Sequence, residues 1–173
     1  MKGFFVKIVD EIPEVKIVRC RTIAEALIRG GFHPQKVDLV SGLIHGTFHP
    51  TVTASADVLY EPLAKEHEGD MEYCRTCAIA SLDAEMTVSE LYRALDKAGY
   101  YPASISEGAS YLSMHMVENV MHLGTLIRDE RYQEYRLFTR GNGKVEFVPF
   151  YSATKLKAYY KIVVVKKEGD KKR

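Results

Sequence analysis

The sequence predicts an α+β protein in which an antiparallel or mixed sheet carries helices packed on one of its faces. Two segments read as capped amphipathic helices and several runs read as β-strands. The hydrophobic and charged fractions, 46% and 27%, are ordinary for a globular protein. The 173 residues fit a single domain or two closely packed halves, residues 1–70 and 71–165, followed by a flexible basic tail at residues 166–173.

A strand-helix-Gly-aromatic-x-Pro unit occurs twice along the chain. Residues 26–34 return in similar form as residues 94–102, and each copy ends a helix with glycine, an aromatic residue, one further residue and proline. Capping-box pairs open both helices, namely Thr22 with Glu25 and Thr87 with Glu90. The apolar spacing of the two helices predicts that Leu27, Leu91 and Leu95 are buried.

The β-rich runs surround these helices. Residues 4–9 and 15–20 are separated by a charged segment with a proline and read as a hairpin or as two neighbouring strands. Further strands are predicted at residues 52–60, 73–82, 120–127, 132–139, 144–151 and 159–165. Short helices are predicted after the two repeat prolines, at residues 35–43 and 104–114. The last strand contains an unbroken aliphatic stretch, so we expect it to be covered on both faces.

Composition limits the classes of protein that fit. No stretch approaches the roughly 20 apolar residues that a membrane-spanning helix needs. The cysteines Cys20, Cys74 and Cys77 are too few for a disulfide framework and favour a reducing compartment, so we expect a cytoplasmic protein without membrane association. Residues 1–100 carry 11 Lys/Arg and 15 Asp/Glu, whereas residues 101–173 carry 13 and 8, which makes the C-terminal part basic.

Several segments together resemble a loose family of small bacterial proteins of unknown function. They are residues 22–34, residues 95–107, the Leu-Gly-Thr run at residues 123–125 and the closing valine-rich strand. Members of that family resemble this chain in a helix that ends in Ala-Gly-aromatic and in a later Gly-x-x-Pro-Ala segment followed by strands. The resemblance covers about two thirds of the chain and brings no activity or catalytic residue with it.

Two pairs of residues have the spacing of metal ligands. Cys74 and Cys77 form a CxxC motif, and His45 and His49 are four residues apart, as two ligands on one helical turn would be. However, a strand at residues 73–82 would direct the two sulfurs to opposite faces, and glycine and proline around the histidines favour a loop. We therefore expect no metal and no cofactor, although the sequence leaves metal binding by these pairs open.

Other patterns offer weaker candidates for chemistry. His115 and His122 flank a methionine-rich stretch beside Glu118 and could form a general acid–base pair, but the methionines are more typical of core packing. The sequence contains no Gly-x-Ser-x-Gly, Walker, GxGxxG, His-Glu-x-x-His or EF-hand motif. No catalytic residue is therefore assigned.

A basic, tyrosine-containing stretch near the C-terminus is typical of nucleic-acid surfaces. Lys155, Lys157 and Lys161 would contact phosphates while Tyr159 would stack on unpaired bases. The same residues also fit a basic strand edge that keeps the sheet from pairing with other chains.

The sequence thus favours a non-catalytic protein-interaction or regulatory module of bacterial or mobile-element origin, with a protein as its partner. The alternative is an RNA- or DNA-binding protein that uses the basic C-terminal half. A small enzyme or zinc-binding protein is the second alternative. The oligomeric state is left open by the sequence.

Overall fold

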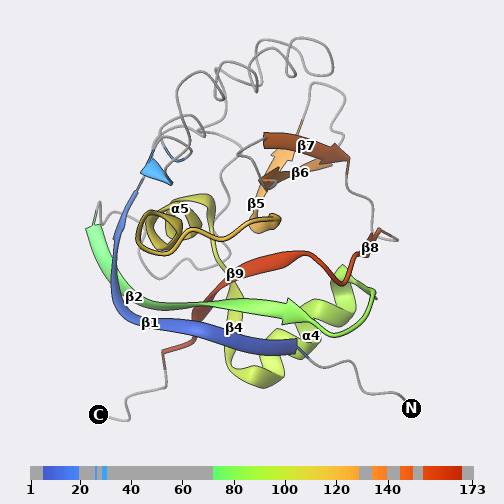
Figure 1. Cartoon of the computed structure of the whole chain (residues 1–173), viewed down its shortest axis with the longest axis horizontal. Helices are drawn as coiled ribbons and strands as arrows, with labels where there is room; N and C mark the ends of the chain where they lie inside the picture. Colours follow the sequence, from blue (N-terminus) through green and yellow to red (C-terminus); the bar gives the residue numbers. More distant parts are fainter. Residues whose placement is uncertain are drawn as a thin grey trace.

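A seven-stranded mixed sheet organises the molecule (Figure 1). The computed structural model describes residues 6–19, 26, 29–30, 72–128, 134–139, 145–149 and 154–168. Within these residues the strand order is β1-β2-β9-β5-β6-β7, with β4 also paired to β9. The strands of this sheet are β1 (Val6–Val18), β2 (Glu72–Leu82), β4 (Tyr100–Pro102), β5 (Val120–Arg128), β6 (Glu134–Thr139), β7 (Val145–Pro149) and β9 (Lys161–Lys166).

The sheet is mixed because one of its pairings is parallel. β5 runs parallel to β9, whereas every other pairing recorded within the sheet is antiparallel. Two further short strands, β3 (Met86–Thr87) and β8 (Lys155–Leu156), form a separate antiparallel ribbon. Together with the two helices described below, this arrangement confirms the predicted α+β class with a mixed sheet.

The first strand corrects the prediction of two strands joined at a turn. β1 is one strand of 13 residues paired with β2, and its register shifts twice between Val9 and Val15. The turn-like residues lie at these irregularities, since Asp10 and Glu14 have φ values of 53° and 52°. Pro13 is tolerated because β1 is at the end of the described strand order, where a missing N–H costs least.

Strand β9 is buried on both faces, as its aliphatic sequence predicted. Ile162 and Val164 belong to one hydrophobic cluster, while Val163 and Val165 belong to another. All four side chains are at most 3% exposed. Because side chains alternate along a strand, the four residues fill both sides of the sheet at its centre.

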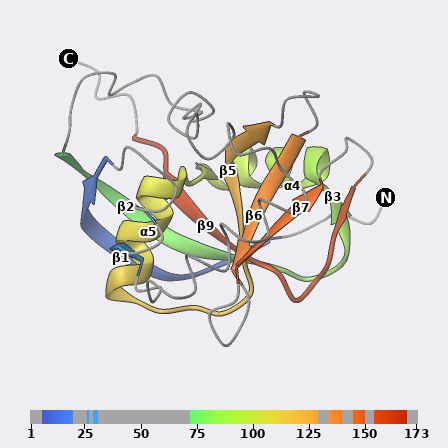
Figure 2. The same cartoon turned by 90° about the horizontal axis from the view of Figure 1, so that it is seen from above.

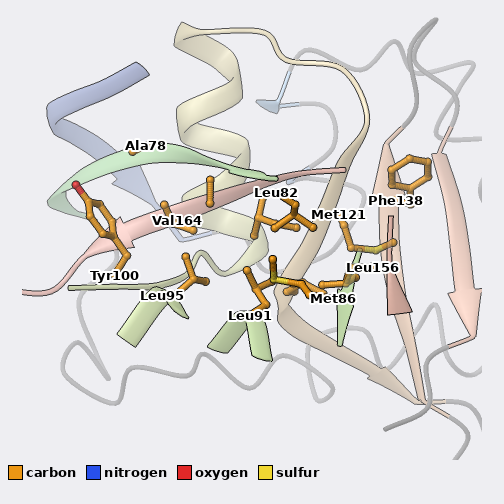
Figure 3. Close-up of a cluster of buried hydrophobic side chains, with 13 residues drawn as sticks. Ala78, Leu82, Met86, Leu91, Leu95, Tyr100, Met121, Phe138, Leu156 and Val164 are labelled. Carbon is orange, nitrogen blue, oxygen red and sulfur yellow. The ribbon is translucent and has the colours of Figure 1, made fainter. Parts of the chain in front are cut away.

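The two helices lie on opposite faces of the sheet, whereas the sequence predicted a single face (Figure 2). Helix α4 (Val88–Ala98) packs Leu91 and Leu95 against the face that carries Ala78 and Ala80. Figure 3 shows this cluster, in which the α4 leucines point toward the sheet. Helix α5 (Ile105–Met114) buries Tyr111 and Leu112 against the other face. The sequence could identify both helices, but the face that each covers depends on the path between strands.

Helix α4 begins and ends where the sequence predicted. The Thr87 hydroxyl accepts a hydrogen bond from the Glu90 amide, and the Glu90 carboxylate accepts one from the Thr87 amide at 2.7 Å. Gly99 terminates the helix with a φ of 84°, a conformation that favours glycine. Leu91 and Leu95 are fully buried, which confirms the predicted apolar face.

The first copy of the repeated unit lies largely outside the described residues. Ala26 is helical and buried, and the Gly30 amide donates to the Ala26 carbonyl at 2.9 Å. Thr22, Glu25 and Leu27 are outside the described residues, so the internal repeat stays a prediction. The same holds for the strand predicted at residues 52–60 and the helix at 35–43.

The segment after β9 is held against the fold for longer than predicted. Lys166 is still part of β9, and the Lys167 amide donates to the Gly99 carbonyl at 2.8 Å. Glu168 forms an ion pair with Arg75. Residues 166–168 thus have defined contacts, residues 169–173 are outside the described part of the chain, and the flexibility of the tail stays a prediction. No helix within the described residues is long and apolar enough to cross a membrane.

Gly124 marks a close crossing between β5 and the end of β4. A Cβ atom at Gly124 would lie 2.1 Å from the Ala103 carbonyl oxygen and 2.6 Å from that of Pro102. Both atoms are backbone and cannot move aside without displacing β4. By contrast, a Cβ atom at Gly99 would meet nothing within 4 Å and would strain only its own backbone.

We expect Gly124→Ala to destabilise the protein by about 3 kcal/mol or more through this overlap. Gly99→Ala is the control, and its left-handed conformation should cost about 1 kcal/mol. Urea unfolding followed by circular dichroism measures both free energies. Equal losses for the two variants would contradict the close crossing.

His122 is a buried histidine held neutral by its surroundings. Its side chain packs against Gly108 of α5, and its Nε2 atom lies 3.4 Å from the Thr139 Oγ1 atom. Burial lowers the pKa of His122 to about 4. Because an unfolded histidine takes up a proton near pH 6.5, protonation favours the unfolded chain between these two values.

The free energy of unfolding should therefore fall by about 3 kcal/mol through His122 alone as the pH decreases from 6.5 to 4. His122→Gln should remove this slope, which urea unfolding at a series of pH values measures. His115→Gln is the control, since it leaves the buried imidazole in place. A wild-type slope that persists in His122→Gln would show that another group titrates.

Candidate functional site

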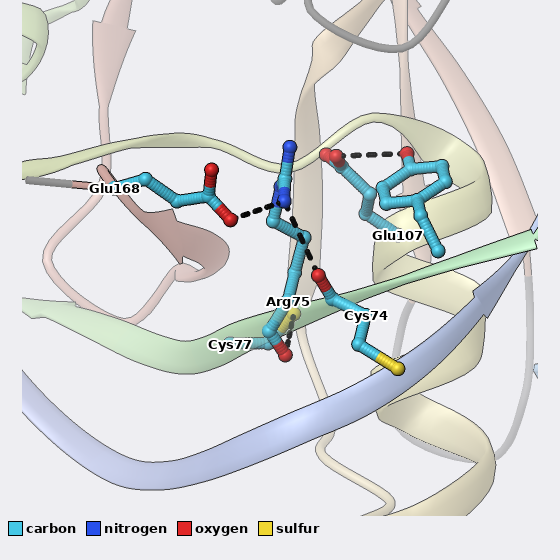
Figure 4. Close-up of polar contacts among 6 residues, drawn as sticks. Cys74, Arg75, Cys77, Glu107 and Glu168 are labelled. Carbon is cyan, nitrogen blue, oxygen red and sulfur yellow. Dashed lines mark hydrogen bonds and ion pairs between the residues drawn. The ribbon is translucent and has the colours of Figure 1, made fainter. Parts of the chain in front are cut away.

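A cluster of polar side chains lies between the start of β2 and helix α5 (Figure 4). Tyr73, Arg75 and Cys77 alternate along β2 and therefore share the face that α5 covers. Glu107, in the first turn of α5, approaches this face from above the strand. The cluster thus combines three positions of one strand with one position of a helix that begins 28 residues or more later in the chain.

Glu107 is a buried carboxylate with defined partners for both oxygens. Its Oε2 atom accepts from the Ser104 amide at 2.8 Å, and its Oε1 atom accepts from the Tyr73 hydroxyl at 3.0 Å. The residue is only 4% exposed. Burial raises the pKa of Glu107, while the hydrogen bonds and the nearby Arg75 guanidinium oppose that increase.

Arg75 is a nearly buried cation that links the cluster to the C-terminal segment. Its Nη1 atom donates to the Glu168 carboxylate at 2.6 Å and to the Cys74 carbonyl at 3.2 Å. The guanidinium lies 5.3 Å from the centre of the Tyr73 ring, within the range of a cation–π contact. The Arg75 side chain is 4% exposed, whereas that of Glu168 is 65% exposed.

The neighbouring titratable groups are held in their neutral forms. Burial raises the pKa of the Cys77 thiol to about 12, and the negative charge of Glu107 adds to this effect. Burial and Glu107 also raise the pKa of Tyr101, with Arg75 acting in the opposite direction. A protonated thiol is a poor nucleophile, so Cys77 is not poised for covalent chemistry.

A groove of about 460 Å³ opens beside Arg75. The ladder between β2 and β9 reaches only as far as the Cys77–Val165 pair, so the start of β2 continues beyond the region of pairing with β9. The groove lies at this place, between the start of β2 and the segment after β9. It is lined by Glu14, Cys74, Arg75, Thr76, Lys166, Lys167 and Glu168.

The lining of the groove is polar and carries more positive than negative charges. Arg75, Lys166 and Lys167 supply three cations, and Glu14 and Glu168 supply two carboxylates. The lysines also have partners outside the lining. Lys166 lies 3.4 Å from Glu11, and Lys167 pairs with Asp96 of α4. The groove is therefore a surface on which an anionic group would find cations within reach.

The CxxC motif does not form a convergent pair of ligands. Cys74 is exposed and Cys77 is buried, because the two residues occupy opposite faces of β2. This placement confirms that residues 73–82 form a strand. Within the described residues no group of three or more histidine, cysteine or acidic side chains is placed to hold a metal. His45 and His49 are outside those residues.

The two histidines of the weaker catalytic hypothesis have separate partners. His115 Nε2 lies 3.2 Å from Asp10 Oδ2 at the surface, whereas the buried His122 contacts Thr139. The structure does not join them into an acid–base pair with Glu118. The interpretation of the flanking methionines as core residues is right for Met121, which is buried, and wrong for Met114 and Met116, which are 60% and 57% exposed.

The four residues of the nucleic-acid hypothesis are divided between two strands: Lys155 is on β8, Lys157 and Tyr159 follow it, and Lys161 begins β9. Lys157 lies 3.6 Å from Glu85. Hydrogen bonds from Thr87 are the main cause of the lowered pKa of Glu90, and the charge of Lys155 contributes to it. Lys161 donates to the Ser81 hydroxyl at 2.9 Å. Tyr159 is 57% exposed and contacts Tyr160 edge to face.

No family model, curated protein or solved structure matches the chain.

The cluster around Arg75 is not predicted by the sequence analysis. One local signal was present, because Ser104 and Glu107 have capping-box spacing like the two pairs that were recognised. The contact of Arg75 with Glu168 has no local signal, since the two residues are 93 positions apart.

Replacing the Glu107 carboxylate should change how stability depends on pH. A raised pKa in the folded state means that folding favours the protonated acid, so the free energy of unfolding falls as the pH rises from about 4.5 through the folded-state pKa. Glu107→Gln removes this loss, which amounts to about 1.4 kcal/mol for each pH unit of the window.

Urea unfolding between pH 4 and 8 measures the difference between wild type and Glu107→Gln. The difference should shift in favour of the variant as the pH rises. Glu118→Gln at an exposed position is the matched control and should show no such trend. A difference that is constant with pH would contradict a raised pKa for Glu107.

Proposed function

We propose that this protein is a non-catalytic interaction module that binds a protein partner at the groove beside Arg75. The observation that carries the proposal is the contact between Arg75 and Glu168. A nearly buried guanidinium at the groove is neutralised from outside by an exposed carboxylate. In this proposal, an anionic group of a partner polypeptide can occupy the same position.

The chemistry of the surrounding groups supports binding over catalysis. The Cys77 thiol has a raised pKa. Both carboxylate oxygens of Glu107 accept hydrogen bonds, one from the Ser104 amide that caps helix α5 and one from the Tyr73 hydroxyl on β2. The Tyr73 contact joins α5 to β2, the strand that supplies the groove residues Cys74, Arg75 and Thr76. A preformed wall reduces the conformational entropy that a partner must overcome on binding.

Two further features support this assignment. The cysteine content fits a protein that works in the reducing environment of the cytoplasm, which we propose as its location. The groove volume of about 460 Å³ lies within the range of pockets that receive ligands of a few residues or a small molecule.

Nucleic-acid binding at β8 is the second proposal, and one observation favours it. Tyr159 presents an exposed aromatic ring next to the exposed Lys155 and Lys157. However, Glu85 and Glu90 lie beside these lysines and reduce the positive potential that phosphates would require. The groove lysines likewise pair with Glu11 and Asp96, but the groove also contains the nearly buried cation Arg75, and it therefore ranks first.

Paired charge reversals separate the two proposals. The double variant Lys166→Glu/Lys167→Glu inverts the charge of the groove, and Lys155→Glu/Lys157→Glu applies the same change to β8. We expect affinity purification from the cell of origin to recover one stoichiometric partner with wild type and the β8 variant. The groove variant should lose about tenfold or more of that partner, as expected when cations face an acidic surface.

Mass spectrometry and gel densitometry measure the recovered partner, and circular dichroism checks that each variant is folded. Equal recovery with wild type and the groove variant would overturn the proposed groove function. Salt-dependent retention on single-stranded DNA or RNA, lost only in the β8 variant, would support nucleic-acid binding instead.

A further inference from the structure

The ion pair between Arg75 and Glu168 is asymmetric. The cation is nearly buried and is fixed by the Cys74 carbonyl and the Tyr73 ring, whereas the carboxylate is exposed. A buried charge that loses its counter-ion is strongly destabilised. An exposed carboxylate that leaves is rehydrated at little cost. Arg75 therefore requires an anion more than it requires Glu168 in particular.

The charges around this pair favour an exchange of one carboxylate for another. With Glu168 withdrawn, the groove retains Arg75, Lys166 and Lys167 as cations and only Glu14 as an acid. Lys166 and Lys167 keep their contacts with Glu11 and Asp96, which lie outside the lining. An incoming carboxylate would thus meet the buried Arg75, which Glu168 now neutralises, beside two lysines that already have acidic partners.

We infer that the groove binds an acidic segment of a partner protein, with a partner carboxylate taking the place of Glu168 on Arg75. This inference rests on the proposed function and names the chemical class that the site recognises. The structure itself supplies the precedent, because the group now at Arg75 is a glutamate carboxylate carried on a polypeptide segment that leaves β9. Glu168 is accordingly a built-in competitor for the site.

Competition by the Glu168 carboxylate determines how tightly a partner must bind at Arg75. Glu168 is two residues beyond the end of β9, so its effective concentration at Arg75 is high and a partner must outcompete it. A single acidic group in solution should therefore bind weakly. A segment with several carboxylates can engage Arg75, Lys166 and Lys167 together, which favours an acidic peptide over an isolated carboxylate.

Fluorescence anisotropy with labelled hexaglutamate tests this inference on the full-length protein. Glu168→Gln removes the competing charge and should tighten binding of the peptide by about tenfold. Glu118→Gln, an exposed substitution outside the groove lining, should match wild type. Lys167→Glu should weaken binding. Labelled hexaglutamine reports contributions that do not involve carboxylates and should not bind.

Nuclear magnetic resonance provides a reading at the site without altering Arg75, whose substitution could unfold the protein. The Arg75 Nε–Hε signal should move in Glu168→Gln, and in this variant it should move again when hexaglutamate is added. Free glutarate is the second probe, and it should compete with the peptide only at a concentration at least tenfold higher.

Each outcome supports or overturns a defined statement. Equal affinity of hexaglutamate for wild type and Glu168→Gln would overturn competition by Glu168. If hexaglutamate bound to neither protein, the inference that the groove recognises carboxylates would be overturned. If glutarate competed as effectively as the peptide, the inference that the ligand is a segment with several carboxylates would be overturned. In all three cases, partner recovery that depends on Lys166 and Lys167 would leave the proposed function standing. Loss of that dependence would remove the proposed function itself.

Discussion

The burial of β9 on both faces is the constraint on which the rest of the structure depends. Its four consecutive aliphatic residues contribute to both hydrophobic clusters, and the strand pairs with β2, β4 and β5. Because β9 joins the two layers, the helices on opposite faces share one support. Its end at Lys166 also determines where the chain leaves the sheet, and this departure positions Glu168 beside Arg75.

Elements with strong local signals could be predicted from the sequence, and elements whose identity depends on distant partners could not. The capping box at Thr87, the left-handed Gly99 and the aliphatic run of β9 are encoded within a few neighbouring residues. β1 was divided in two because Asp10 and Glu14 resemble turn residues. In the structure both residues lie at irregularities of β1, and the pairing of β1 with β2 continues on either side of them. The paired residues of the two strands are more than fifty positions apart in the chain.

The candidate site shows the same distinction at the level of side chains. The sequence could predict that the CxxC motif does not form a pair of ligands, because the alternation of side chains along a strand places Cys74 and Cys77 on opposite faces. Arg75, between them, reads as an ordinary charged residue of a strand. Its burial results from α5 above the strand and from the segment after β9, and neither contact can be derived from the spacing of nearby residues.

Arg75 lies between two acidic side chains with different physical roles. Glu107 is buried on the inner side of Arg75 and accepts hydrogen bonds from Tyr73 and Ser104, and burial raises its pKa. Glu168 is exposed and provides the charge on the groove side. Burial favours the protonated form of Glu107, so the guanidinium depends on an anion on its groove side. In the proposed exchange, a partner carboxylate would replace Glu168 and keep the buried cation paired.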